Sequence, residues 1–516
     1  MISGLRNIAS VLVCANAVLG HTQARASELA TDVKALLGAS KLDPRCVGYS
    51  IIDLDNSAVL AKYNDQLALM PASNAKVLTT GAALITLGAD FNFETRLVCA
   101  TVNGHTTLTL VGSGDPALFD AEMIRSDGSH GNWTTVGAAS DAWTSALIGA
   151  GIRSVDEFVV DARIFDEESM PQGDLKWKTN SDAGTYAVGV WGLNIAANAA
   201  VVTPTWTPGA RPSLASVEPP FPLTVNKNEA TCQSKQKESF GIGYEKAANA
   251  LTFYGNLSKR GGTYAVAIHN PLPLTAAMFA QEFTKRGVAV QRWRVAGSAD
   301  PVALGATVLP VLTTPIATVL RGANTESKNI YAEGLAKRMG AARANGLHAA
   351  IGPTSRPGSL DLGMAALSAA IDGRLAPRSS ESISLIDASG LSDKNRVNAD
   401  ITARWIAAIA RDGALMRSYI GSFARPGEQG TLKNRFKDAH FQKVAVYGKS
   451  GYINGVSCLS GIVIATDSGQ SIVYSILCNG LTGNVAQAKA LHESIVNRIA
   501  KELESRSAQT ATAASH

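Results

Sequence analysis

Hydrophobic and polar positions follow helix and strand periods most clearly at the two ends of the chain. Residues 28–37 have a helical period, and residues 47–54 and 58–63 predict two strands around a short turn. The segment from Met70 to Lys76 opens an apolar stretch, Val77 to Leu87, that stops at Gly88. This stretch predicts a helix whose first turn contains Ser73 and Lys76.

The region from about 91 to 300 has a different pattern. Short segments rich in Thr and Val are separated by Gly, Asn and Asp, which predicts an inserted and largely β unit. Six prolines fall between Pro204 and Pro222, and they indicate an extended loop or a boundary between subdomains.

Helical patterns return after Pro315, and two further strands come before the last helix. We expect helices over 325–339, 362–371 and 399–412, strands over 455–465 and 471–479, and a last helix with apolar residues at every fourth position from Leu491 to Leu503. This order predicts one α/β domain built from both ends of the chain, with the insert growing out of it. The low-complexity segment 507–516 predicts a disordered tail.

The two strands before the last helix predict a hairpin around the turn at residues 466–470. A five-residue turn would place Cys458 opposite Cys478. Two interpretations stay open, a disulfide across the strands or two opposed buried thiols. The five cysteines after residue 26 are odd in number and form no C-x-x-C pair, which argues against a zinc site or a disulfide framework.

The first 26 residues have the features of a cleaved secretory leader. Arg6 precedes an apolar run from Ile8 to Leu19, and Ala24-Arg25-Ala26 supplies a small-x-small cleavage pattern. The run is too short for a membrane anchor, and Val13 before Cys14 does not fit a lipidation site. No later segment has 18 uninterrupted apolar residues. We therefore expect a periplasmic protein without a transmembrane segment in the mature chain, either free or loosely associated with the membrane.

Composition narrows the function classes. The chain has 516 residues, of which 46% are hydrophobic and 17% charged, as in an ordinary globular protein rather than a disordered or polytopic membrane protein. A net charge of +5 is too small to indicate nucleic acid as a partner. No two of the eight histidines lie three to five residues apart, so we expect no metal.

Three short motifs together suggest nucleophilic catalysis: Ser73-Asn74-Ala75-Lys76, Ser327-Lys328-Asn329 and Lys449-Ser450-Gly451. Ser-x-x-Lys alone is weak evidence, because Ser234 and Lys237 match it in a polar run with no helix around them. Residues three apart on a helix share a face, so Lys76 could remove the proton of the Ser73 hydroxyl. Burial and a second cation, Lys449, would favour the neutral amine that this role needs.

Gly448-Lys449-Ser450 also matches the end of a phosphate-binding loop. The first glycine of that motif should stand at Lys443, and a strand rather than a helix is expected around Ser450, so the nucleotide interpretation fails. On an edge strand, Lys449 and Ser450 would instead present a cation and a hydroxyl to a substrate carboxylate, while the strand backbone pairs with an extended peptide.

With these motifs the sequence resembles the low-molecular-mass class C penicillin-binding proteins, which are D-alanyl-D-alanine carboxypeptidases and endopeptidases. The resemblance covers nearly the whole chain after the leader and includes the three motifs, Gly112–Pro116, Asn324–Glu333, Asp387–Ser392, Gly430–Leu432 and Arg435-Phe436. It implies an α/β fold of the serine β-lactamase and transpeptidase type, with an antiparallel sheet flanked by helices. The catalytic domain would comprise 27–95 and 305–506, and residues 96–304 would form a mainly β insert of two subdomains.

The resemblance also implies roles for individual residues. Ser73 would attack the carbonyl between two D-alanines of a peptidoglycan stem peptide, Lys76 would take its proton, and Ser327 would pass a proton to the leaving amine. Asn329 would hold the substrate amide, Lys449 and Ser450 the terminal carboxylate, and the backbone N–H groups of Ser73 and Tyr452, which follows Gly451, would form the oxyanion hole. β-Lactams would acylate Ser73, and no cofactor would be needed.

Two departures from the family concern the substrate side chain. Related members have an arginine and a glutamine where this chain has Asp393 and Asn454, so a carboxylate on the side chain loses its bidentate partner, and Lys394 is a candidate substitute. Asp161 and Phe165 match a recognition region of the insert, although a plain structural role at a strand end is an equal alternative. The rival functions are a β-lactamase and a catalytically inactive wall-binding protein.

Overall fold

The computed structural model describes residues 27–127, 134–171, 174, 177, 184–300, 307–346, 356–437, 439 and 441–514. The expected leader, residues 1–26, lies outside the described residues. The chain divides into two compact units. Unit 1 contains the chain up to Gly81, residues Ile371–Leu385 and the chain from Asp393 onward, and unit 2 contains Ala82–Ala370 and Ile386–Ser392. The domain boundaries expected from the sequence stay a prediction.

A five-stranded antiparallel sheet forms the centre of unit 1, in the order β17-β18-β19-β1-β2. Its strands are β1 (Val47–Asp53), β2 (Val59–Tyr63), β17 (Val444–Ile453), β18 (Val456–Ala465) and β19 (Ser471–Cys478). Every residue of β1 and β19 is buried, because helices cover both faces of the sheet. The sequence expectations for these strands are confirmed.

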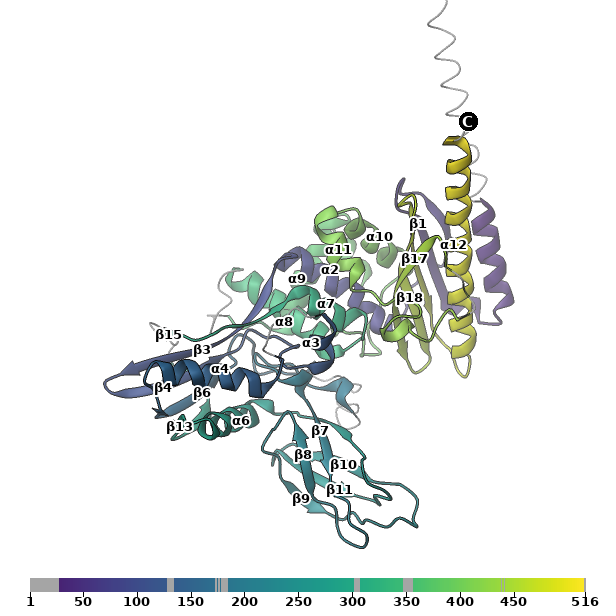
Figure 1. Ribbon diagram of the computed structural model, residues 1–516. Helices are drawn as coiled ribbons and strands as arrows, with labels where there is room; N and C mark the ends of the chain where they lie inside the picture. Colours follow the sequence, from purple (N-terminus) through teal and green to yellow (C-terminus); the bar gives the residue numbers. More distant parts are fainter. Residues whose placement is uncertain are drawn as a thin grey trace, which may run out of the picture. The chain divides into compact units, whose positions relative to one another are not determined.

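The two faces of this sheet are covered by different helices (Figure 1). On one face lie a helix over residues 27–39 and the long helix α12 (Val485–Ala514), which share a core with β1, β18 and β19. On the other face lies α10 (Ala399–Ala410), with α11 (Gly413–Gly421) packed against it. Short 3-10 turns complete the unit: η1 (Pro44–Cys46), η2 (Ala72–Asn74), η5 (Ser379–Ser382) and η6 (Gly430–Leu432).

The last helix is longer than the sequence pattern predicts. Its apolar positions from Leu491 to Leu503 are buried as expected, but α12 continues to Ala514 through the segment expected to be a disordered tail. Alanine and glutamine in that segment have high intrinsic helix propensity. The expectation of disorder rested on low sequence complexity and did not take this propensity into account.

The expected hairpin register is wrong by one residue. Cys458 pairs with Leu477 and Cys478 with Ser457, because the turn closes between Ala465 and Gln470 and is one residue tighter than expected. A shift of one residue places the two cysteines on opposite faces of the sheet. Both are buried free thiols, so a disulfide between them is excluded.

Unit 2 is built around a six-stranded mixed sheet, in the order β14-β6-β4-β3-β15, with β16 also paired to β3. Its strands are β3 (Asn92–Val102), β4 (His105–Val111), β6 (Glu157–Asp161), β14 (Trp293–Val295), β15 (Thr307–Val308) and β16 (Leu312–Pro315). α4 (Val136–Gly149) and α6 (Pro271–Lys285) pack on this sheet through aromatic contacts among Trp143, Phe158, Phe279 and Phe283. These two helices, and α3 (Ala121–Asp127), lie in a region expected to be largely β.

Three smaller sheets belong to the same unit. They are ordered β12-β7-β8, β10-β11-β9 and β13-β5. Their strands are β5 (Ser154–Val155), β7 (Ala199–Pro204), β8 (Leu214–Glu218), β9 (Val225–Asn228), β10 (Gly241–Glu245), β11 (Ala250–Tyr254), β12 (Tyr264–Ala267) and β13 (Ala289–Val290), with 3-10 turns η3 (Thr185–Ala187) and η4 (Ala196–Asn198). The proline-rich stretch begins at Pro204, the last residue of β7, and contains β8 between Pro212 and Pro219.

The helices of the C-terminal half of unit 2 are α7 (Ile316–Asn324), α8 (Asn329–Asn345) and α9 (Leu360–Arg374), which ends in unit 1. The single helix expected over 325–339 is thus wrong at its start. Ser327 has a φ of 63°, which no right-handed helix accommodates, so the chain turns between α7 and α8. The helices expected over 362–371 and 399–412 are confirmed.

Candidate active site

Ser73 and Lys76 lie where the 3-10 turn η2 leads into α2 (Ala75–Leu87). The sequence predicts Ser73 in the first turn of the helix, but the structure places it in the 3-10 turn before the helix. The Lys76 side chain is fully buried, and its Nζ donates a hydrogen bond of 3.0 Å to Ser73 Oγ. Ser73 itself is half-buried, so the residue is partly open to solvent.

The start of α2 is fixed by close packing against α10 and α11. An added Cβ at Gly81 would lie 2.3 Å from Ile409 Cδ1 and 2.6 Å from Trp405 Nε1, so only glycine permits this approach. The backbone carbonyl of Val77 accepts hydrogen bonds from Trp405 Nε1 at 3.1 Å and from Tyr419 Oη at 2.8 Å. These contacts hold the turn that carries Lys76 in one position.

The segment before Ser73 is held in an uncommon conformation. Ala72 is fully buried with a φ of 46°, and such a conformation costs an alanine about 1–2 kcal/mol. Asn479, 409 residues away in the chain, fixes the segment, because its Oδ1 accepts from Met70 N at 2.8 Å and its Nδ2 donates to Met70 O at 3.0 Å. Sequence reasoning missed Asn479.

Strand β17 lies directly against η2. An added Cβ at Gly451 would be 2.7 Å from Pro71 O and 3.1 Å from Ser73 N, which explains the need for glycine in the third motif. Asn74 strengthens this contact. Its neighbours are satisfied when the side-chain amide is oriented so that Nδ2 donates to Lys449 O at 2.5 Å and Oδ1 accepts from Leu459 N at 3.1 Å. The first and third motifs are thus brought together in unit 1.

β17 is an edge strand, as expected for the segment around Lys449 and Ser450. Its outer edge pairs with Ala424 at Gly448, through hydrogen bonds of 2.9 and 3.1 Å. Because backbone groups alternate along a strand, those of Ser450 and Tyr452 point to the same outer edge as those of Gly448. Lys449 is fully buried, and its Nζ donates to Ser450 O at 2.7 Å.

Two residues at the end of β17 are more exposed. Tyr452 is 60% exposed, and Lys489 of α12 lies over its ring at 5.8 Å. Asn454 is an exposed turn residue between β17 and β18. Asp393 and Lys394, the other positions expected near the substrate side chain, are also exposed.

The second motif belongs to unit 2. Ser327 and Lys328 lie in the turn between α7 and α8, and Asn329 is the first residue of α8. Asn329 is buried and its Nδ2 donates to Tyr186 O at 2.8 Å. The left-handed φ of Ser327 again carries a cost of about 1–2 kcal/mol, so the surroundings must hold it.

The segment Asp387–Ser392 of unit 2 is a turn organised by one carboxylate. Asp387 Oδ1 accepts from Gly390 N at 2.6 Å, and Oδ2 accepts from Ser392 N at 2.7 Å and from Trp177 Nε1 at 2.8 Å. Glu333 of α8 accepts from Ala388 N at 3.2 Å. The hydrogen bond between Glu333 and Ala388 therefore connects the family motifs at Asn324–Glu333 and Asp387–Ser392. Trp177, which the sequence did not indicate, helps to hold the Asp387 carboxylate.

Asp161, expected as a candidate substrate contact, ends strand β6 and is engaged within the chain. Its two oxygens bind the Arg163 guanidinium at 2.9 and 2.6 Å, and its side chain is 4% exposed. This ion pair raises the pKa of Arg163 and favours the structural interpretation of Asp161. The ring of Phe165 lies against Gly114, whose added Cβ would be 2.1 Å from it.

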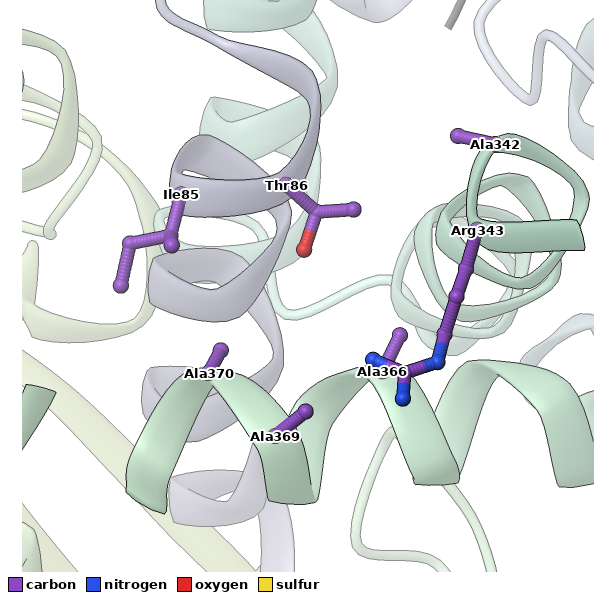
Figure 2. Close-up of a pocket in the computed structure, with 7 residues that line it drawn as sticks. All are labelled: Ile85, Thr86, Ala342, Arg343, Ala366, Ala369 and Ala370. Atoms are coloured by element: carbon purple, nitrogen blue, oxygen red, sulfur yellow. The ribbon is translucent and has the colours of Figure 1, made fainter. Parts of the chain in front are cut away.

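Two pockets lie away from these motifs. One in unit 2, of about 350 Å³, is lined by Ile85, Thr86, Ala342, Arg343, Ala366, Ala369 and Ala370, and Figure 2 shows the Arg343 side chain extending toward Ala366 of α9. The other, in unit 1, of about 370 Å³, borders β17 at Val444–Val446 and has Arg425, Lys433, Arg435 and Lys437 in its lining. Glu428 and Glu493 pair with Arg425 and Arg435 there.

In the described part of the chain, no three His, Cys, Asp or Glu side chains gather in a way that could hold a metal. None of the described helices combines the length and hydropathy that crossing a bilayer requires.

Comparison with known proteins decides the family. The family model for the D-Ala-D-Ala carboxypeptidase 3 (S13) family matches residues 29–502. The chain belongs to the D-Ala-D-Ala carboxypeptidase 3 (S13) family. It is 25% identical to the D-alanyl-D-alanine carboxypeptidase of Actinomadura sp. (strain R39), over 95% of this chain and 88% of that protein. It is 24% identical to carboxypeptidase DacB of Mycolicibacterium smegmatis, over 84% of this chain and 77% of that protein.

The solved structure of penicillin binding protein 4 (dacB) from Haemophilus influenzae has the same fold. It aligns with a TM-score of 0.68 at 20% identity, covering 87% of this chain and 96% of that one. The expected fold class, the family resemblance and the assignment to serine-type D-Ala-D-Ala carboxypeptidases are confirmed. The positions assigned to individual catalytic residues come from the motifs and remain proposals.

Proposed function

We propose that this S13 family member is an exported serine D,D-peptidase that cleaves D-Ala-D-Ala stem peptides and D-Ala cross-links of peptidoglycan, with Ser73 as the nucleophile. The observation that carries the proposal is the 3.0 Å hydrogen bond between Lys76 Nζ and Ser73 Oγ at the start of α2. A serine hydroxyl needs an adjacent base, and in the neutral form this lysine can accept its proton. Export rests on the leader pattern of residues 1–26.

The reaction then proceeds through an acyl-enzyme. Lys76 removes the proton from Ser73 Oγ as the oxygen attacks the carbonyl between the two D-alanines. The developing oxyanion accepts hydrogen bonds from the backbone N–H groups of Ser73 and Tyr452, each worth about 2.7–4 kcal/mol in related sites. Support for this pair is the close approach of β17 to η2 at Gly451 and the outward direction of the Tyr452 backbone.

The remaining motif residues bind substrate and complete the proton transfer. Ser327 passes a proton to the amine of the leaving D-alanine, and Asn329 holds a substrate amide. Lys449 and Ser450 bind the terminal carboxylate, for which a cation and a hydroxyl on an edge strand are suited. Water then hydrolyses the ester at Ser73 and restores the enzyme.

β-Lactams fit the same reaction, because their cyclic amide resembles the D-Ala-D-Ala bond. Attack by Ser73 opens the ring, but the amine remains tethered to the acyl group and cannot leave. The ester therefore persists longer than the ester formed from a peptide. The H. influenzae protein with the same fold has been solved in complex with a β-lactam.

The direct test is release of D-alanine from a peptide ending in D-Ala-D-Ala by the purified mature chain. Ser73→Ala should reduce the rate at least 10³-fold, because it removes the attacking atom. Ser234→Ala is a matched control, since Ser234 also precedes a lysine by three positions but is exposed in a loop. Equal D-alanine release by wild type and Ser73→Ala would exclude the proposal.

A further inference from the structure

The turn that carries Ser327 is held by a carboxylate that neither the motifs nor the family match assigns. Lys328 Nζ lies 2.6 Å from Asp120 Oδ2, and Tyr331 Oη donates to the same oxygen at 2.7 Å. Lys328 comes directly before Asn329 and Tyr331 comes two residues after it, so side chains on both sides of Asn329 converge on one acceptor. Asp120 is 6% exposed and lies 208 residues from Lys328 in the chain.

The rest of the turn is fixed by packing and backbone bonds in the same unit. Lys328 N donates to Gly322 O at 3.0 Å, which closes the turn after α7. An added Cβ at Gly322 would lie 2.3 Å from the Tyr331 ring, so α7 packs directly against this ring. Arg321 donates to Met123 O at 2.7 Å and ties α7 to the segment that follows Asp120.

The neighbouring carboxylates of Asp120 and Glu122 make Lys328 a structural cation rather than a second base beside Lys76. Burial alone would lower the pKa of Lys328, but the carboxylates of Asp120 and Glu122 outweigh it and raise the pKa above the ordinary value. Glu122 contributes at 2.8 Å, yet its side chain is 63% exposed, so water screens that contact. Burial and Asp120 together hold the pKa of Tyr331 well above its usual range, which keeps the hydroxyl a hydrogen-bond donor.

We propose that Asp120 is a positioning residue that, through Lys328 and Tyr331, holds Ser327 and Asn329 in the geometry the reaction needs. This inference rests on the proposed roles of Ser327 and Asn329. The left-handed conformation of Ser327 is unfavourable by itself, so it persists only while the flanking residues are anchored. A buried carboxylate that accepts from both flanking side chains supplies that anchor.

The test is the rate constant with which a chromogenic β-lactam acylates the enzyme, measured together with the fraction of enzyme that is titrated. We expect Asp120→Asn to lower the acylation rate constant and kcat for D-alanine release 10- to 100-fold, with KM changed less than threefold and the titrated fraction unchanged. A merely structural role would lower the titrated fraction and leave the rate constant of the active molecules at the wild-type value.

The matched control is Glu122→Gln, which removes the exposed partner of the same lysine and should change the rate constant less than twofold. Tyr331→Phe removes only the second donor to Asp120 and should lower the rate constant three- to tenfold, so it decides the question if Asp120→Asn does not fold. Wild-type rate constants in Asp120→Asn, or in Tyr331→Phe in its place, overturn the positioning role. That result leaves the proposed function intact, which fails only if the wild type is not acylated or releases no D-alanine.

Discussion

The two serine motifs place a lysine beside a helix start in contrasting surroundings. In unit 1, the buried Lys76 near the start of α2 meets the uncharged hydroxyl of Ser73 in the turn before that helix. In unit 2, Lys328 meets the carboxylates of Asp120 and Glu122, and its pKa is raised. The comparison teaches that the nearest partner, not the presence of a lysine in a motif, decides whether the amine is suited to proton transfer or to holding a turn.

The largest expected effect is the difference in acylation rate constant between the two variants in which each of these lysines is replaced by arginine. Arginine keeps the charge but does not lose its proton, so Lys76→Arg should lower the β-lactam acylation rate constant at least 10³-fold, about 4 kcal/mol. Lys328→Arg keeps the ion pair with Asp120 and should stay within fivefold of wild type. Stopped-flow acylation measures both. The comparison breaks if the two variants lose activity equally.

Two glycines test whether each region depends on close packing. Gly451→Ala would place a Cβ 2.7 Å from the Pro71 carbonyl, and Gly322→Ala would place one 2.3 Å from the Tyr331 ring. Each should lower the free energy of unfolding by about 1–3 kcal/mol, because neither neighbour can move aside easily. Urea denaturation measures the loss.

Gly373→Ala is the matched control for these substitutions. Gly373 lies in α9 with no atom within 4 Å of an added Cβ, so alanine there should stabilise the chain by about 0.5–1 kcal/mol. Destabilisation by Gly373→Ala as large as that by Gly451→Ala would show that the loss is not due to local contact.

One buried group in each unit, Asp115 and His492, should change the stability of the chain in opposite directions on acidification. Burial raises the pKa of Asp115 of unit 2 to about 6, and the charge of Asp120 adds to this, although the hydrogen bond of 2.5 Å that Asp115 accepts from Thr314 acts in the opposite sense. Since its unfolded pKa is lower, the protonated form stabilises the fold, and this contribution is lost as pH rises through 6. Between pH 7 and pH 5, wild type should gain about 1–2 kcal/mol relative to Asp115→Asn.

His492 of unit 1 behaves in the opposite sense. Burial, with Arg435 and Lys489 nearby, holds its pKa well below the ordinary value, so the folded chain keeps the ring neutral. The unfolded chain takes up a proton as pH falls below about 6.5, and this destabilises the fold. The stability of wild type relative to His492→Gln should therefore fall on acidification. Parallel pH curves for wild type and each variant would contradict these assignments.

The smallest expected effect concerns the thiols of the described chain. Cys46, Cys99, Cys232, Cys458 and Cys478 are free, and burial raises the pKa of Cys458 to about 12. We expect all five to be alkylated after denaturation without reductant, and Cys458 to be unreactive in the native protein. A disulfide would lower the mass of the unreduced chain by about 2 Da. Such a loss, mapped to Cys458 and Cys478, would contradict the hairpin register.

The sequence allowed the motifs, the family and most elements of unit 1 to be predicted, because helix and strand periods and short motifs are local. What it missed depends on contacts between distant segments. Asn479 holds Met70 from 409 residues away, and Asp120 holds Lys328 from 208 residues away. The hairpin register failed because one residue in the turn decides which face each cysteine takes.

The measurement that tests the central claim most directly is intact-mass spectrometry of the mature chain after brief exposure to benzylpenicillin, followed by peptide mapping. The account predicts a single adduct of one penicillin mass on the peptide that contains Ser73, and no adduct on Ser73→Ala. An adduct that maps to another residue, or that forms equally on Ser73→Ala, would contradict it.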